Sequence, residues 1–287
     1  MIKTTKKLTV LLFVAATMLQ GLSLRAQTLI DNYRFATRVD ETAWIDITGG
    51  ASALVTPPAS GWATSGGFGS LLTNIGFTFP FAGTDYTTFG TNLMGAVRLG
   101  ARITVTQSGT SILSTATTLP KIDGLGLRGM ADTSCYIRCA IIGTAGSRVL
   151  VVEHRLAIYQ HTNTFVSWQT QLYEATGEVW LVYGPSEGIS ELPTTQPGLA
   201  KSNTDMLFLD FANHSVQRFA STPVPVNAAG VWPEEGRCYI FTPDSAACPA
   251  PPTVTALSSD PDSTMLSLSA GGLVYRLCIP AMGLDTL

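Results

Sequence analysis

Two glycine-rich motifs in this sequence have the spacing of loops that carry enzyme chemistry. Gly124–Gly129 has the sequence GLGLRG and matches G-x-G-x-x-G, the pattern of phosphate-binding loops. Gly184–Gly188 has the sequence GPSEG and matches G-x-S-x-G, the pattern that exposes a nucleophilic serine. Both chemistries need a helix directly after the motif. The first motif is followed by MADTS and then by the strand-like CYIRCAII, and the second by ISELP, which is a poor helix. We therefore interpret both motifs as loops at strand ends. We therefore expect no cofactor and no serine nucleophile.

Three carboxylates are candidates for glycosidase chemistry, which uses two carboxyl groups about 5 Å apart in the retaining enzymes. They are Glu153, Glu174 and Glu178. Arg155 lies two residues after Glu153 on the same face of an extended run, so we interpret Glu153 as half of a surface ion pair. His154 falls on the apolar face of that run, which favours a hydrogen-bonded core histidine over a base. We expect no catalytic residue, and a protein that is not an enzyme.

The pattern of cysteines and histidines gives little support to metal binding. No two cysteines have C-x2-C spacing, and His154, His161 and His214 are scattered, so we expect no metal site. The chain contains five cysteines, which leaves at least one thiol outside any internal disulfide. Cys238 and Cys248 flank a short segment and can form a disulfide across it.

Aromatic side chains are the remaining candidates for contact with a ligand. An indole ring presents a large rigid surface with one polar atom, which suits stacking on a sugar. We assign this role to Trp62, Trp180 and Trp232. Packing in the core or at its rim is the alternative for each of them.

The composition excludes several classes of protein. Only 13% of the 287 residues are charged, which is too few for a disordered chain. Lys and Arg number 17 against 20 Asp and Glu, so the chain lacks the basic excess of a nucleic-acid-binding protein. We expect no nucleic acid partner.

Residues 1–27 have the order of a secretory signal peptide. Lys3, Lys6 and Lys7 precede an apolar run over 8–19, and small residues follow before position 28. The apolar run is shorter than the roughly 20 residues that span a bilayer, and no later segment is long enough. We expect an exported protein, secreted, periplasmic or on the outer cell surface, with no transmembrane segment after cleavage.

The elements that must position these side chains are strands, because apolar residues recur with a period of two. Residues 149–159, 165–173 and 178–184 predict an antiparallel meander, and further strands are expected over 75–81, 86–89, 96–99, 206–211 and 237–242. This pattern predicts an all-β fold, an antiparallel β-sandwich of jelly-roll-like type over 28–243. A proline-rich linker over 244–252 separates it from residues 253–287, which are too few to bury a core alone.

Two segments resemble a known kind of module. Residues 75–100, beginning IGFTFPFAG, and residues 151–184, ending in GEVWLVYG, are similar to N-terminal β-sandwich modules of exported Gram-negative proteins of the type IX secretion type. His154 stands where those modules usually have Trp. Residues 248–269, beginning CPAPP, resemble the opening strands of a fibronectin type III domain, of which 253–287 would be an incomplete copy.

The resemblance implies an exported, non-catalytic interaction module. Such a module is adhesin-like, or a carbohydrate- or protein-binding surface protein, and its partner is an extracellular glycan or protein. The alternative is an accessory β-sandwich module of a secreted hydrolase whose catalytic part is absent here.

Overall fold

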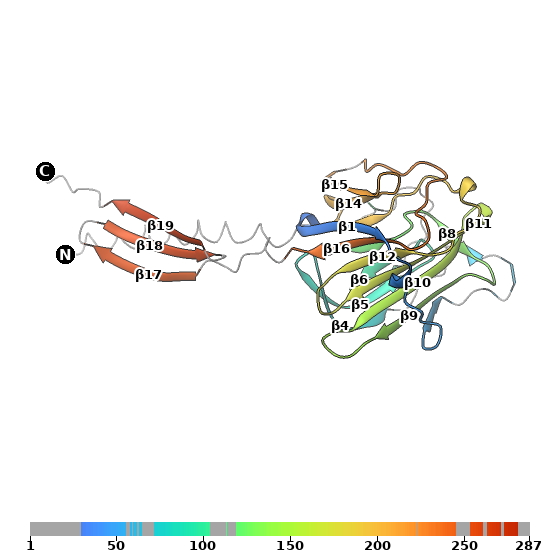
Figure 1. The fold of residues 1–287 in the computed structure, drawn as a ribbon, viewed down its shortest axis with the longest axis horizontal. Coiled ribbons are helices and arrows are strands. Elements are labelled where there is room, and N and C mark those ends of the chain that lie inside the picture. Colours follow the sequence, from blue (N-terminus) through green and yellow to red (C-terminus); the bar gives the residue numbers. More distant parts are fainter. Residues whose placement is uncertain are drawn as a thin grey trace. The chain divides into compact units, whose positions relative to one another are not determined.

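The computed structural model describes most of the chain between residues 30 and 280. The described residues are 30–55, 58, 60–61, 63–64, 72–103, 113, 119–221, 223–244, 253–260, 263–270 and 273–280. The expected signal peptide, Trp62 and Cys248 lie outside them. The chain divides into two compact units, one formed by Thr28–Pro243 and the other containing the C-terminal strands (Figure 1).

The first unit contains a nine-stranded antiparallel sheet. Its strands pair in the order β1 (Tyr33–Val39), β16 (Arg237–Pro243), β12 (Val179–Tyr183), β11 (His161–Tyr173), β10 (Val149–Ile158), β8 (Gly129–Ala131) and β3 (Ala63–Thr64). A branch adds β9 (Tyr136–Ile142), which pairs with both β10 and β2 (Ser52–Val55). The expected meander is confirmed as β10, β11 and β12, with His154 opposite Trp168 and Trp168 opposite Tyr183.

A seven-stranded antiparallel sheet forms the second layer of the sandwich (Figure 1). Its order is β15 (Ser215–Phe219), β14 (Asp205–Asp210), β13 (Gly198–Ser202), β7 (Lys121–Asp123), β6 (Ala96–Leu99), β5 (Thr84–Thr91) and β4 (Thr73–Phe81). In the described residues the only helices are the short 3-10 turns η1 (Ile30–Asn32), η2 (Glu41–Ala43) and η4 (Ile189–Glu191). The prediction of an all-β antiparallel sandwich is therefore confirmed.

The core between the two sheets follows from the alternation of apolar residues. In β4, Ile75, Phe77, Phe79 and Phe81 are buried while the residues between them are exposed. They belong to one continuous apolar cluster with inward-facing residues of β10 and β11, among them Trp168. Burial of large side chains on both inner faces provides the main driving force for this packing.

His154 is a core residue, as its position in the alternating run predicted. Its ring is fully buried and stacks on Trp168, with ring centroids 4.4 Å apart and an interplanar angle of 4°. Its Nε2 atom lies 3.1 Å from Thr91 Oγ1. Burial lowers the pKa of His154 from 6.5 to about 3, because the charged imidazolium would lose its hydration.

This burial predicts a loss of stability in acid. Between pH 6.5 and about 3 the unfolded chain binds a proton at His154 that the folded chain does not, so stability falls as the pH falls through this window. We expect the melting temperature of the parent protein to fall more steeply over that window than that of His154→Phe, which keeps the ring stack and cannot titrate. Equal slopes for the two proteins in thermal melts would contradict the assignment.

Both glycine-rich motifs lie in loops, as expected. Gly124–Gly129 joins β7 to β8, and Gly126 has a φ of 63°. A Cβ atom there would lie 2.0 Å from the carbonyl carbon of Gln196, so glycine is required for close packing of two backbone segments. Gly184–Gly188 follows β12 and leads only into the three-residue turn η4. Neither motif has the helix that its chemistry requires.

The second unit contains a three-stranded antiparallel meander. Its strands are β17 (Thr253–Asp260), β18 (Ser263–Ala270) and β19 (Leu273–Pro280). Its likeness to a fibronectin type III domain stays a prediction. No helix in the described parts of the chain is long and apolar enough to cross a membrane.

Candidate functional site

Polar side chains cover the outer face of β9, β10 and β11, the face turned away from the core. The strand register places Arg138, Glu153 and Gln169 in one row across the three strands. Glu153 is 1% exposed and accepts hydrogen bonds from Arg138 Nη2 at 2.6 Å and from Gln169 Nε2 at 2.9 Å. The hydroxyl of Tyr136 donates to the same carboxylate at 2.8 Å. The side chains of this row are therefore held in place by hydrogen bonds and by the Arg138–Glu153 ion pair.

The expected surface ion pair of Glu153 with Arg155 is wrong. Glu153 is buried and pairs with Arg138 on the neighbouring strand, while Arg155 Nη2 lies 3.1 Å from the exposed carboxylate of Glu187. Side chains directly opposite each other on antiparallel strands are closer than those two residues apart along one strand. The strand register, which the local sequence does not reveal, determines which arginine pairs with Glu153.

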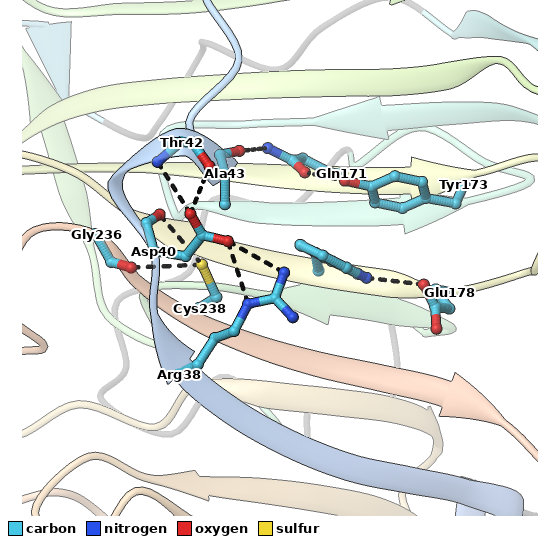
Figure 2. Close-up of polar contacts among 10 residues, drawn as sticks. Arg38, Asp40, Thr42, Ala43, Gln171, Tyr173, Glu178, Gly236 and Cys238 are labelled. Atoms are coloured by element: carbon cyan, nitrogen blue, oxygen red, sulfur yellow. Dashed lines mark hydrogen bonds and ion pairs between the residues drawn. The ribbon is translucent and has the colours of Figure 1, made fainter.

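The segment 40–48, which follows β1, lies across this outer face. Gln171 Nε2 donates to the carbonyl of Ala43 at 2.8 Å, and Gln169 exchanges two hydrogen bonds with the backbone of Ile45, at 2.7 and 3.1 Å. The Asp40 carboxylate accepts from the backbone N–H and the hydroxyl of Thr42 at the start of η2 (Figure 2). Two buried glutamines of β11 thus hold the segment in place.

A cleft of about 620 Å³ lies beside this segment. Strands β9 to β11 contribute Tyr136, Arg138, Glu153, Arg155 and Ser167; the segment 40–48 contributes Glu41, Trp44, Asp46 and Thr48; residues 183–185 and 235–236 complete the lining. The indole of Trp44 packs against Gly184, where a Cβ atom would lie 2.6 Å from a ring carbon. The glycine that ends β12 therefore makes room for the aromatic side chain of the cleft.

The charges of the cleft are mostly negative at its exposed edge. Hydrogen bonds from Thr48, together with the charge of Arg138, lower the pKa of Asp46. Glu41 and Glu235 are exposed, and in the described part of the chain the structure records no ion pair for either carboxylate. The Glu41 side chain lies against Gly236, since a Cβ atom there would be 3.3 Å from Glu41 Cγ. We call Glu41, Asp46 and Glu235 the rim carboxylates.

Trp180 and Trp232, two of the expected ligand contacts, are not among the residues that line the cleft. Trp180 is half-buried on the outer face, where its Nε1 donates to Glu178 at 3.0 Å and Arg38 lies 5.0 Å above its ring. Trp232 packs edge-on against Tyr183, with ring centroids 5.1 Å apart. Their contact with a ligand stays a prediction, as does that of Trp62, which lies outside the described residues.

Trp44, the indole that does line the cleft, was not among the tryptophans predicted to contact a ligand. It lies in the stretch Asp40–Thr48, DETAWIDIT, which has no strand periodicity and carries three acidic residues around one tryptophan. A large aromatic residue among carboxylates in an irregular segment was the available signal, because loops held on a rigid scaffold often carry binding residues.

The carboxylates proposed for glycosidase chemistry bind separate partners. Glu174 forms a two-bond ion pair with Arg148, at 2.5 and 2.8 Å, beside the turn between β9 and β10. Glu178 accepts from Trp180 and from the hydroxyl of Thr242. Together with the buried pair of Glu153, these contacts give each carboxylate a structural role.

The Glu174 pair predicts a second acid-dependent loss of stability. Hydrogen bonds from Arg148 lower the pKa of Glu174 from 4.5 to about 2, so the contribution is present above pH 4.5 and is lost as the pH falls toward 2. In Glu174→Gln we expect a shallower fall of the melting temperature between pH 4.5 and 2. The control Glu191→Gln, an exposed carboxylate elsewhere, should keep the parent slope, and a parent slope in Glu174→Gln would refute the prediction.

Cysteine chemistry in the sandwich is limited by burial. Cys135, Cys139 and Cys238 are buried thiols, and burial raises the pKa of each to about 11. The Cys238 thiol donates to the carbonyl of Gly236 at 3.4 Å (Figure 2). Because Cys248 is not described, a Cys238–Cys248 disulfide stays a prediction. Within the described residues no group of three or more His, Cys, Asp or Glu side chains could hold a metal ion.

Comparison with known proteins gives one match. The family model described as NIDO related matches residues 32–243, which span almost all of the sandwich. No curated protein matches the chain, and no solved structure does.

Proposed function

Because this chain belongs to the NIDO-related family, we propose that it is an exported, non-catalytic interaction module, adhesin-like in role, which binds an extracellular partner through the cleft on its nine-stranded sheet. Two observations support export. NIDO-related domains are typically extracellular, and residues 1–27 have the residue order of a signal peptide.

The preformed cleft is the observation that carries the proposal. Its volume of about 620 Å³ lies within the range of small-ligand sites, and its polar groups converge around one indole. Hydrogen bonds from Gln169 and Gln171 hold the segment 40–48 in place, and the ion pair with Arg138 fixes Glu153. A surface that is already ordered loses less conformational entropy when a ligand binds.

The state of the polar groups in the cleft favours binding over catalysis. A general acid or base must be free to exchange a proton with substrate. Glu153, the most buried carboxylate of the lining, instead accepts from three side chains, those of Tyr136, Arg138 and Gln169. His154 faces the opposite side of β10 and lies in the core.

A binding array of extracellular proteins and glycans tests this function. We expect the purified full-length chain to bind one class of probe, and Trp44→Ala to weaken that binding at least about 30-fold, since truncation of a central aromatic contact can cost about 2 kcal/mol or more. Trp180→Ala removes a half-buried indole outside the cleft on the same face of the sheet. It therefore distinguishes binding in the cleft from binding elsewhere on that face. Binding that depends on Trp180 and not on Trp44, with both variants folded by circular dichroism, would place the site elsewhere.

A further inference from the structure

We infer that the cleft binds a neutral saccharide, and that the rim carboxylates Glu41, Asp46 and Glu235 exclude acidic glycans. This inference rests on the proposed function, because it names the ligand class of the same cleft. Three properties of the lining support it: its aromatic surface, its mixture of hydrogen-bonding groups and its charge.

Trp44 supplies the apolar surface of the cleft. Trp44 is partly buried, its ring packs against Gly184, and the hydrogen bonds of the next residue, Ile45, to Gln169 hold its backbone in place. Saccharide rings have one face of C–H groups and a periphery of hydroxyls, and a fixed indole matches the apolar face while polar groups meet the periphery.

The polar lining contains donors and acceptors side by side, as hydroxyl groups require. Arg138 uses Nε and Nη2 for Glu153, and Arg155 uses Nη2 for Glu187, so both guanidinium groups have further N–H donors beside the cleft. Thr48 and Ser167 add hydroxyl oxygens, which can accept hydrogen bonds. Planar groups with two parallel donors or acceptors suit neighbouring hydroxyls of a sugar.

A glycan fits this lining better than a peptide segment. Peptide and protein partners take much of their affinity from apolar anchors that enter apolar pockets. In this cleft the aromatic and charged side chains of Trp44, Tyr136, Arg138 and Arg155 prevail, and its aliphatic contribution comes from Pro185. The cleft therefore combines an aromatic surface with hydrogen-bonding groups, and among the described residues it lacks the aliphatic pocket that a peptide anchor would enter.

The charge of the lining selects against anions. Both guanidinium groups already face a carboxylate, Arg138 that of Glu153 and Arg155 that of Glu187. The rim carboxylates add three negative charges at the exposed edge of the same cleft. Like charges brought together at an interface are costly, so a sialic acid or a uronate should be rejected while its neutral counterpart is accepted.

The test uses the full-length chain on an array that carries neutral oligosaccharides, the sialylated or uronate-bearing forms of the same oligosaccharides, and random dodecapeptides. We expect binding to neutral oligosaccharides at least about tenfold above their acidic forms. Trp44→Ala should weaken this binding at least about 30-fold, and Trp44→Phe, which retains an aromatic ring, should restore part of it.

The double variant Glu41→Gln/Glu235→Gln removes two rim charges without touching the core. We expect it to keep neutral binding and to gain binding to the acidic forms. The control Asp85→Asn/Glu191→Gln removes two exposed charges outside the cleft and should leave the preference unchanged.

Each other outcome has a definite meaning. Equal binding of acidic and neutral forms, or Trp44-dependent binding to peptides and not to saccharides, overturns the inference and leaves the interaction module standing. Absence of any Trp44-dependent binding, with the variant folded by circular dichroism, overturns the inference and the proposed function together.

Discussion

Replacement of Trp168 by alanine is expected to lower the free energy of unfolding of the sandwich by about 3–5 kcal/mol, the usual cost of truncating a large buried aromatic residue. The indole is fully buried, stacks on His154 and meets the edge of Trp232. It also packs against two glycines, because a Cβ atom at Gly124 would lie 2.3 Å from its Nε1 and one at Gly95 would lie 2.7 Å from a ring carbon. Neighbours without side chains cannot fill the cavity that alanine would leave.

Denaturant unfolding followed by tryptophan fluorescence measures this effect in the full-length chain. All five tryptophans of the protein lie between residues 44 and 232, so the signal reports on the sandwich alone. Trp180→Ala is the matched control, since that ring is half-buried on the outer face and its loss should cost less than half as much. A loss below about 1 kcal/mol for Trp168→Ala would mean that the ring does not lie in the core.

Arg138→Ala is expected to destabilise the sandwich by about 3–5 kcal/mol, because it leaves the Glu153 carboxylate buried without a counter-charge. Glu153 is 1% exposed, so in the folded protein its charge is stabilised by the guanidinium and by neutral side-chain donors rather than by water. The double variant Arg138→Met/Glu153→Gln removes both charges and keeps an acceptor for the Tyr136 hydroxyl. We expect it to recover most of the loss.

The neighbouring pair provides the control for this prediction. Arg155 binds Glu187, whose side chain is 62% exposed, and Arg155→Ala should therefore cost at most about 1 kcal/mol. The same unfolding measurement applies to all three variants. A double variant that loses as much stability as Arg138→Ala would show that the charge pair does not act as a unit.

Alternation of apolar residues was sufficient to predict the strands that face the core on one side. Residues 75–81, 149–159 and 165–173 alternate in the sequence, and they form β4, β10 and most of β11. Short strands were not predicted, because too few residues are present for the alternation to be visible. Lys121–Asp123 and Gly129–Ala131, β7 and β8, are buried at every position, so a period of two is not visible in three residues.

The candidate site was less predictable than the fold. The sequence placed Glu153 and Arg155 on one strand and suggested that they pair, whereas the carboxylate pairs with Arg138, 15 residues earlier in the chain. Trp44 enters the cleft because Gln169 and Gln171, 124 and 128 residues from the backbone atoms that they bind, hold its segment against β11. Contacts over such separations depend on the register of strands that are distant in sequence.

The amino-acid sequence by itself determined the all-β class, the position of His154 on the core face of its strand, and the loop conformation of both glycine-rich motifs. These properties are local, since they depend on the side-chain period of an extended chain and on the residues next to a turn. Only the tertiary structure decided which charges pair and which indole lines a cleft. The charges pair because β9, β10 and β11 lie side by side in one register. Trp44 lines the cleft because the segment after β1 packs against Gly184, the residue that follows β12.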